Sequence, residues 1–180
     1  MGKGRDELAY NLVLRGNRAR LKQLLRKHLE LKSSHTAMLV YGSIWHNRGM
    51  LRWLLAQGVD PDCRMGKKGN TPLMQAASDG DVWAIKILLE YGANPNALNE
   101  QLENPLGFAT SWEQLDSIKI LVDAGAEIND IVDSGPFRTQ LDCAELSSWQ
   151  SGADLLRSLG GRRYNELEER SEAAEQSVPR

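Results

Sequence analysis

The chain has 180 residues, 41% of them hydrophobic and 26% charged, values that are ordinary for a water-soluble protein able to bury a core. No run of about 18 apolar residues occurs, so no membrane span is predicted, and the first residues lack the apolar stretch of a secretory signal. The net charge of −2 hides a gradient, because residues 1–35 sum to +6, residues 36–70 to +3 and the remainder to −11.

The N-terminal segment predicts a pair of helices. Residues 6–25 show apolar spacing typical of two helices around Gly16, without the proline and the terminal glycine found in later units. A polar, atypical outer unit is what a stack of repeats needs at its end. We therefore expect residues 1–36 to form a degenerate N-terminal capping repeat.

A short pattern then recurs at a nearly constant period. Leu-Leu-x-x-Gly occurs at residues 54–58 and 88–92, returns as Leu-Val-x-x-Gly at 121–125, and is degraded at 156–160. Its final glycines are 34, 33 and 35 residues apart. A period near 33 residues predicts stacked copies of one small unit. In such a stack, sequence order becomes spatial order, so one end should be basic and the other acidic.

The unit that begins at Thr71 is the best preserved. Thr71 and Pro72 supply an N-cap and a first-turn proline for one helix. Gly80 predicts the end of that helix, and Asp81 predicts the N-cap of a second helix with an apolar stripe. Gly92 ends the second helix, and turn-forming residues follow. The unit therefore reads as helix, tight turn, helix and loop.

This unit resembles the ankyrin repeat. The Thr-Pro-Leu opening stands at residues 71–73 and in part at 104–106, and the Leu-Leu-x-x-Gly-Ala-x-x-Asn ending stands at 88–96. Met74 replaces the histidine that usually follows the opening. The resemblance implies an all-α helix-turn-helix solenoid that binds proteins, with the first helices and the loop tips lining its concave side.

The register of the glycines divides this single domain into about four repeats behind the cap. We expect repeat 1 at 37–69, repeat 2 at 70–103, repeat 3 with a lengthened loop at 104–138, a C-terminal capping repeat at 139–160, and a charged, partly disordered tail at 161–180.

No catalytic or metal-binding pattern is present in the sequence. His28, His35 and His46 have no metal-ligand spacing, and Cys63 and Cys143 fall in different repeats. No phosphate-binding loop or nucleophile elbow occurs. We therefore predict no cofactor, no metal, no enzymatic activity, and free thiols in a reducing cytoplasm.

Tryptophans stand where solvent exposure is expected. Trp45 and Trp112 each belong to the pair of residues that precedes the turn between the two helices of a repeat. Tryptophan is enriched in interface hot spots. The alternative is that these rings pack on neighbouring helices. Trp83 falls on a second helix, where its ring could be exposed on the convex side.

The other residues expected to contact a partner follow from the same register. They are the turn positions Ile44, Ser78, Asp79 and Ser111, the first-helix positions Tyr41, Met74 and Phe108, the basic first loop with Arg64, Lys67 and Lys68, and the acidic later loops with Glu100 and Asp133. For Tyr41 and Phe108, a core position is an equal alternative. A surface with both signs of charge suits a protein partner.

The sequence thus predicts a non-catalytic protein-binding module, monomeric when free. Among proteins similar to this one, some act as antitoxins or immunity proteins that block a toxin, and that role fits a small chain without a catalytic site. Two alternatives remain open, an enzyme and a nucleic-acid binder that uses the basic N-terminal residues Arg15, Arg18, Arg20, Lys22, Arg26 and Lys27.

Overall fold

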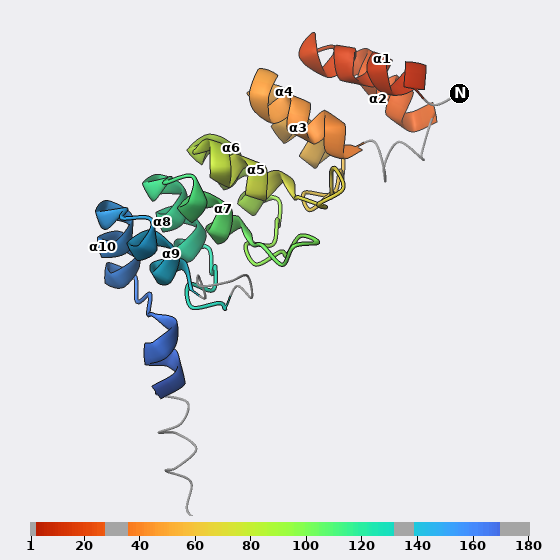
Figure 1. Ribbon diagram of the computed structural model, residues 1–180. Coiled ribbons are helices and arrows are strands. Elements are labelled where there is room, and N and C mark those ends of the chain that lie inside the picture. Colours follow the sequence, from red (N-terminus) through yellow and green to blue (C-terminus); the bar gives the residue numbers. More distant parts are fainter. Residues whose placement is uncertain (1–2, 28–35, 132–138, 170–180) are drawn as a thin grey trace, which may run out of the picture.

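The computed structural model describes residues 3–27, 36–131 and 139–169, which form a stack of helix pairs (Figure 1). The named helices are α1 (Lys3–Leu14), α2 (Arg18–Lys27), α3 (Thr36–His46), α4 (Arg48–Ala56), α5 (Pro72–Asp79), α6 (Val82–Glu90), α7 (Pro105–Ser111), α8 (Leu115–Asp123), α9 (Gln140–Leu146) and α10 (Gln150–Ser158). A further helical stretch covers residues 164–169. The described residues contain no strand, only an isolated bridge between Met65 and Asn70. The all-α solenoid predicted from the repeat period is confirmed.

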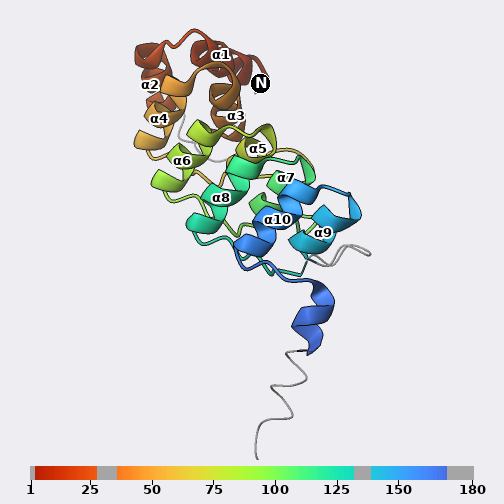
Figure 2. The ribbon, with the colours of Figure 1, turned by 90° about the vertical axis from the view of Figure 1, so that its left-hand side faces the viewer.

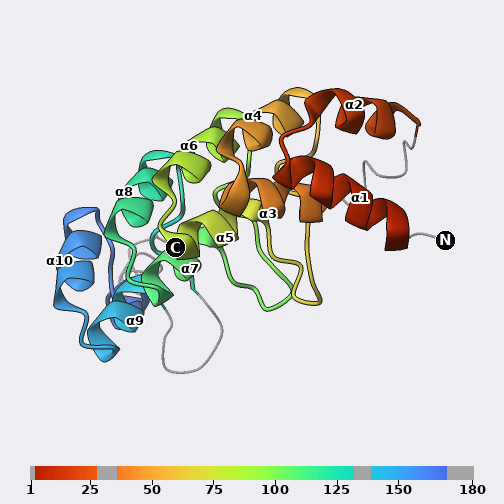
Figure 3. The same ribbon diagram turned by 90° about the horizontal axis from the view of Figure 1, so that it is seen from above.

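The helices lie in two rows (Figure 3). The odd-numbered helices form an inner row and the even-numbered helices an outer row, and the long loops project from the side of the inner row. Each inner helix packs against the next one, as α5 does against α7 and α7 against α9, and α6 packs against α8 in the outer row. The stack bends so that the outer row is convex, and Figure 2 shows the same order of pairs from the side.

The helix termini are set by the residues that the sequence marks. The Thr71 side chain accepts a hydrogen bond from the N–H of Met74, and the Asp81 side chain accepts from two N–H groups at the start of α6. Gly80 ends α5 in the left-handed region at φ 68°. The turn therefore needs glycine for its left-handed conformation, and a Cβ there would also displace the end of the Gln114 side chain.

The core lies between the two rows of helices. The first leucine of the recurring pattern is completely buried in all four copies, at Leu54, Leu88, Leu121 and Leu156. Each such burial contributes about 2 kcal/mol from the removal of apolar surface from water. The period of the sequence is therefore the period of the core.

The N-terminal pair α1 and α2 extends the stack past α3. The Tyr10 ring lies so close to Gly42 that a Cβ at Gly42 would come within 2.5 Å of it. On α2, the Arg18 guanidinium donates to the carbonyl of Gly49 at 2.8 Å. These contacts attach the pair to α3 and α4, and its role as a cap remains a prediction.

Candidate functional site

The concave side of the molecule is built from the inner helices and the loops that lead into them. We call these loops fingers: the first is residues 59–70, the second is residues 93–103, and residues 126–131 are the described part of the third. Each finger enters the N-terminus of an inner helix. The turn to the outer helix, which we call the corner, lies at the opposite end of that inner helix, about 10 Å away for a helix of seven or eight residues.

The first two fingers are joined by backbone and side-chain hydrogen bonds. The N–H of Glu100 donates to the carbonyl of Lys68 at 2.9 Å, and the Arg64 guanidinium donates to the carbonyl of Leu98 at 2.8 Å. The buried Asn99 donates from its amide to the side-chain oxygen of Asn70 at 2.8 Å. The first two fingers therefore form one connected edge rather than two independent loops.

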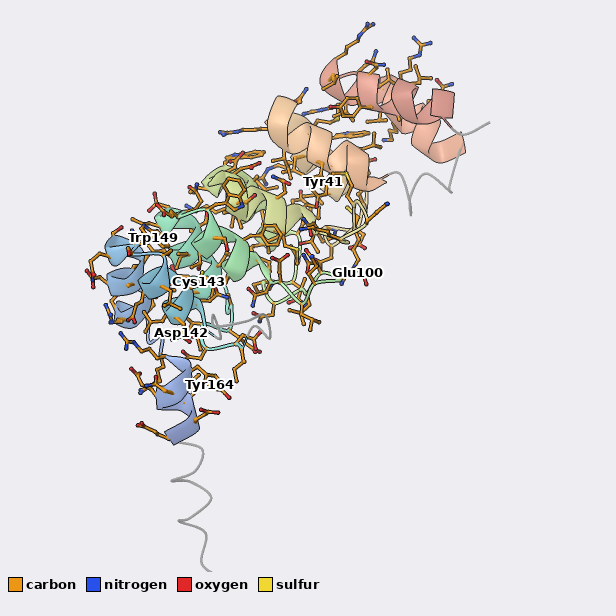
Figure 4. All side chains as sticks on the ribbon, viewed as in Figure 1. Tyr41, Glu100, Asp142, Cys143, Trp149 and Tyr164 are labelled. Atoms are coloured by element: carbon orange, nitrogen blue, oxygen red, sulfur yellow. The ribbon has the colours of Figure 1, made fainter. Side chains whose placement is uncertain are left out.

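The charged finger residues have different surroundings. Lys67, Lys68 and Glu100 are exposed at the tips, and Figure 4 shows Glu100 on the projecting edge. Arg64 is also exposed, but its guanidinium is held by the Leu98 carbonyl. Asp133 lies outside the described residues. The predicted basic and acidic groups thus lie side by side on the first two fingers, while their role in binding is still a prediction.

Three exposed apolar side chains on the fingers were missed by the sequence reasoning. Leu102 is 57% exposed, Ile131 is 55% exposed and Leu98 is 40% exposed. Leu102 also has φ 60°, a conformation that a residue with a branched side chain adopts at a cost. The only sequence signal was the presence of leucine and isoleucine in polar loops outside the repeat period.

The corner positions differ in exposure, because Ile44 and Ser78 are buried whereas the other described ones are exposed. Trp112 follows the last residue of α7 and is 64% exposed, and its neighbour Ser111 and the α5 residue Asp79 are exposed too. Asp79 accepts a hydrogen bond from the Gln75 amide at 3.0 Å. Trp45 lies in the last turn of α3, and its side chain lies outside the part that the structure describes. The expected exposure of Trp112 is confirmed.

Three residues named for the binding surface are buried: the surface placement of Ile44 and Met74 was wrong, and for Tyr41 the core position, an equal alternative in the sequence analysis, is the one observed. Tyr41 is 2% exposed, and its hydroxyl donates to the carbonyl of Asn70 at 2.8 Å, inside the contact between α3 and the first finger (Figure 4). Burial raises the pKa of that hydroxyl well above its usual range. Ile44 is 3% exposed because it packs into the core. Met74 is completely buried, and its sulfur accepts from the N–H of Thr71 at 3.3 Å.

Two further residues predicted for the binding surface are largely covered by the rest of the chain. Ser78 is 9% exposed, and its hydroxyl donates to the carbonyl of Gln75 at 2.9 Å. Phe108 is half-buried and packs against the core. These side chains contribute to packing, because each inner helix contacts its own outer helix and the inner helix of the next repeat.

Two tryptophans stand at the start of outer helices. Trp83, in the first turn of α6, is half-buried, so the ring is less exposed than the sequence suggested. The Arg48 guanidinium lies 5.6 Å from the centre of this ring. Trp149, labelled in Figure 4, is the N-cap of α10. A Cβ at Gly152 would clash with its ring.

The two free thiols lie in different repeats. Burial raises the pKa of Cys63 to about 12, with further contributions from the carboxylates of Asp60 and Asp62. Burial also raises the pKa of Cys143. Within the described ranges, no three His, Cys, Asp or Glu side chains gather as a metal ion would require, and no helix is long and apolar enough to cross a membrane.

A stack of helix pairs with projecting fingers defines a repeat protein that presents an extended surface. A comparison with protein families supports this class, because the model described as "Ankyrin repeats (3 copies)" matches residues 43–131. The chain belongs to the ankyrin repeat family, and ankyrin repeats indicate a protein–protein interaction module. Proteins of this family are generally non-catalytic.

Relatives come from different kinds of organism. The chain is 33% identical over 98 residues to the human "Ankyrin repeat and SOCS box protein 16", a match that covers 54% of this chain and 21% of that protein. It is 35% identical over 107 residues to the "Putative ankyrin repeat-containing protein" of Treponema pallidum (strain Nichols), covering 59% of this chain and 31% of that protein. It is 32% identical over 126 residues to a "Putative ankyrin repeat protein" of Fowlpox virus (strain NVSL), a match that covers 70% of this chain and 26% of that protein. The chain thus spans less than a third of each of these relatives.

Proposed function

We propose that the chain binds a protein partner through the finger edge and the exposed side of the inner helices. The observation that carries this proposal is the set of exposed apolar side chains Leu98, Leu102 and Ile131 on the fingers. The three side chains lie on two consecutive fingers, the second and the third, and exposed apolar patches mark interaction sites. Trp112 adds a large aromatic anchor at the corner end of the same inner row.

The finger edge is suited to binding because it is formed before a partner arrives. The Lys68–Glu100 and Arg64–Leu98 hydrogen bonds join the first two fingers, and Asn99 is buried beneath them. A partner that docks on a preformed surface loses less affinity to the ordering of loops. This supports recognition of a folded protein surface by the finger edge.

The charge pattern supports a protein rather than a nucleic acid at this edge. Lys67 and Lys68 stand beside Glu100, and the described part of the third finger adds Asp130. A phosphate backbone needs a continuous basic track, and the acidic fingers would repel it. A protein partner offers both signs of charge within one interface.

Within this function, we propose that the chain acts as an inhibitor of its partner, in the manner of an immunity protein. Support comes from two features, a rigid preformed surface and a strong charge gradient that steers association. An inhibitor of this kind should reduce the partner's activity at equimolar concentration. Binding without a change in the partner's activity would instead indicate a scaffold.

The proposal is tested by comparative capture from the source organism. Wild-type protein and a Leu102→Ser/Ile131→Ser variant serve as baits, with Leu14→Ser as a control. Leu14 is 38% exposed on α1, away from the fingers. A partner captured by the wild type and the control but lost with the finger variant supports the proposal. Equal capture by all three baits contradicts it.

A further inference from the structure

An open groove of about 800 Å³ lies at the corner edge, between the α3–α4 and α5–α6 turns. The residues that matter for its chemistry are Arg48, Asp79, Asp81, Trp83 and Lys86. Trp83 and Lys86 belong to the outer helix α6, and Arg48 begins the outer helix α4. The groove is therefore separate from the finger edge, which joins the opposite ends of the inner helices.

The ring of Trp83 is held in place but not fully covered. The Arg48 guanidinium lies 5.6 Å from the ring centre and also pairs with an Asp81 oxygen at 3.5 Å. The ring packs against the core on its inner side and remains half-exposed. Its indole N–H has no hydrogen-bond partner among the described residues. This aromatic group thus offers a fixed apolar surface and one hydrogen-bond donor to the groove.

The carboxylates of the groove already have partners. Asp81 accepts from the N–H groups of Trp83 at 3.2 Å and Ala84 at 3.1 Å, in addition to its contact with Arg48. Asp79 accepts from the Gln75 amide at 3.0 Å. Both negative charges are therefore committed to contacts within the chain.

Lys86 differs from its counterpart one repeat later. Lys119, at the same distance from its terminal glycine, pairs with the Asp116 carboxylate at 3.3 Å. The residue that corresponds to Asp116 in α6 is Trp83, so the acid that would pair with Lys86 is replaced by an aromatic ring. Among the described residues, Lys86 forms no ion pair. The groove therefore combines an unpaired ammonium group with an adjacent aromatic surface.

The surroundings of the groove are basic. Arg18 donates to the carbonyl of Gly49, which places a further cation beside Arg48 at the neighbouring corner. Residues 1–70 carry a net charge of +9. An approaching acidic group is attracted by this field before it reaches Lys86.

We propose that this groove is a second docking site, which takes an acidic segment of a partner protein. A carboxylate of the segment accepts a charge-assisted hydrogen bond from Nζ of Lys86, and a neighbouring apolar side chain packs on the exposed part of Trp83. Phosphate chains fit less well, because they carry a charge at every unit, whereas the groove offers one unpaired ammonium group and an aromatic ring. The site goes beyond the proposed function at the finger edge and does not depend on it.

The test uses three pools of capped, fluorescein-labelled nonapeptides. Each pool has a fixed central dipeptide, Glu-Leu, Gln-Leu or Lys-Leu, and random flanking residues, and a ten-nucleotide oligo-dT is the nucleic-acid probe. Binding is followed by fluorescence anisotropy and by the indole ¹H–¹⁵N cross-peak of Trp83, assigned with Trp83→Phe. The variants are Lys86→Gln and the matched control Lys119→Gln, which removes the same charge at the equivalent position of α8.

The proposal expects the Glu-Leu pool to bind and to shift the Trp83 cross-peak. Lys86→Gln should weaken this binding about tenfold, the effect of losing a hydrogen bond between charged groups, whereas Lys119→Gln should change it less than about twofold. Leu102→Ser on the second finger should leave it unchanged, which separates this site from the finger edge. Four results would each overturn the proposal. The first two are equal binding of the Glu-Leu and Gln-Leu pools and equal effects of the two lysine variants on binding. The others are the absence of a Trp83 shift with every pool and binding of oligo-dT that is stronger than binding of the Glu-Leu pool.

Discussion

The side-chain oxygen of Asn96 accepts a hydrogen bond from the backbone N–H of Glu127 at 2.8 Å, linking one finger to the next. The amide of Asn96 also donates to the carbonyl of Gly125 at 3.0 Å. One repeat later, Asn129 makes the same two bonds, from the N–H of Arg162 at 2.8 Å and to the carbonyl of Gly160 at 3.2 Å. These side chains stand four residues after a terminal glycine and join consecutive units.

Asp62 occupies this position in the preceding repeat and completes only half of the contact. Both carboxylate oxygens accept from the N–H of Asn94 at 3.1 Å, but a carboxylate has no N–H to donate to Gly92. Asp62→Asn should therefore stabilise the fold by about 1 kcal/mol at neutral pH, the value of one net hydrogen bond. Urea unfolding measures the change, with Asn96→Asp as the reciprocal control that should destabilise. Loss of stability in Asp62→Asn would contradict the assignment.

The same substitution should alter the dependence of stability on pH. Partial burial, together with the nearby carboxylate of Asp60, raises the pKa of Asp62 in the folded chain. A raised pKa means that the folded state binds the proton more tightly, so the stabilising contribution is present in acid and is lost as the pH rises through the raised value. The advantage of Asp62→Asn should shrink as the pH is lowered toward the ordinary pKa of a carboxylate. An advantage that grows in acid would contradict this sign.

Adjacent serines at the last corner should respond oppositely to glycine. Ser148 has φ 60°, the left-handed region, whereas Ser147 has φ −78° and donates its hydroxyl to the carbonyl of Cys143. Glycine at 148 relieves strain of about 1–2 kcal/mol and adds less than that in unfolded-state entropy, so Ser148→Gly should stabilise slightly. Ser147→Gly should destabilise by about 1 kcal/mol. The measurement is the free energy of unfolding of each variant relative to the wild type. Destabilisation by Ser148→Gly would refute the backbone strain assigned to Ser148.

Removal of the Ser117 hydroxyl should stabilise the folded chain. The side chain is completely buried in α8, and its oxygen has no hydrogen-bond partner in the described part of the chain. The corresponding residue of α6 is Ala84. Ser117→Ala should stabilise by about 1 kcal/mol in thermal or urea unfolding. The matched control is the equally buried Ser43, whose hydroxyl donates to Val40 at 2.7 Å, so Ser43→Ala should destabilise instead.

The thiols should react in a fixed order. Cys63 is 5% exposed, and burial raises its pKa to about 12, whereas Cys143, labelled in Figure 4, is half-buried. At pH 8, iodoacetamide should modify Cys143 slowly and Cys63 hardly at all, because the thiolate is the reactive form. Peptide mass analysis gives the order, and in urea both thiols should react. Faster modification of native Cys63 would contradict its burial.

The repeat period accounts for the core, but it says little about the surface. Leu88 and Gly80 could be placed from the sequence because periodicity and caps are local signals. Met74 was misplaced, and Tyr41 could not be assigned to core or surface, because an inner helix packs on both neighbouring repeats and a single unit does not show which of its sides are covered. Leu102 was missed because a loop has no period, and its exposure depends on how one finger meets the next.

The central claim is that the finger and corner anchors serve binding rather than stability. Its most direct test is the Leu102→Ser/Trp112→Ala variant, measured both by calorimetric titration with the captured partner and by urea unfolding of the free chain. The account predicts binding weakened more than about tenfold, with the unfolding free energy changed by less than about 0.5 kcal/mol, because both side chains are largely exposed. Unchanged affinity, or a loss of stability of several kcal/mol, would contradict it.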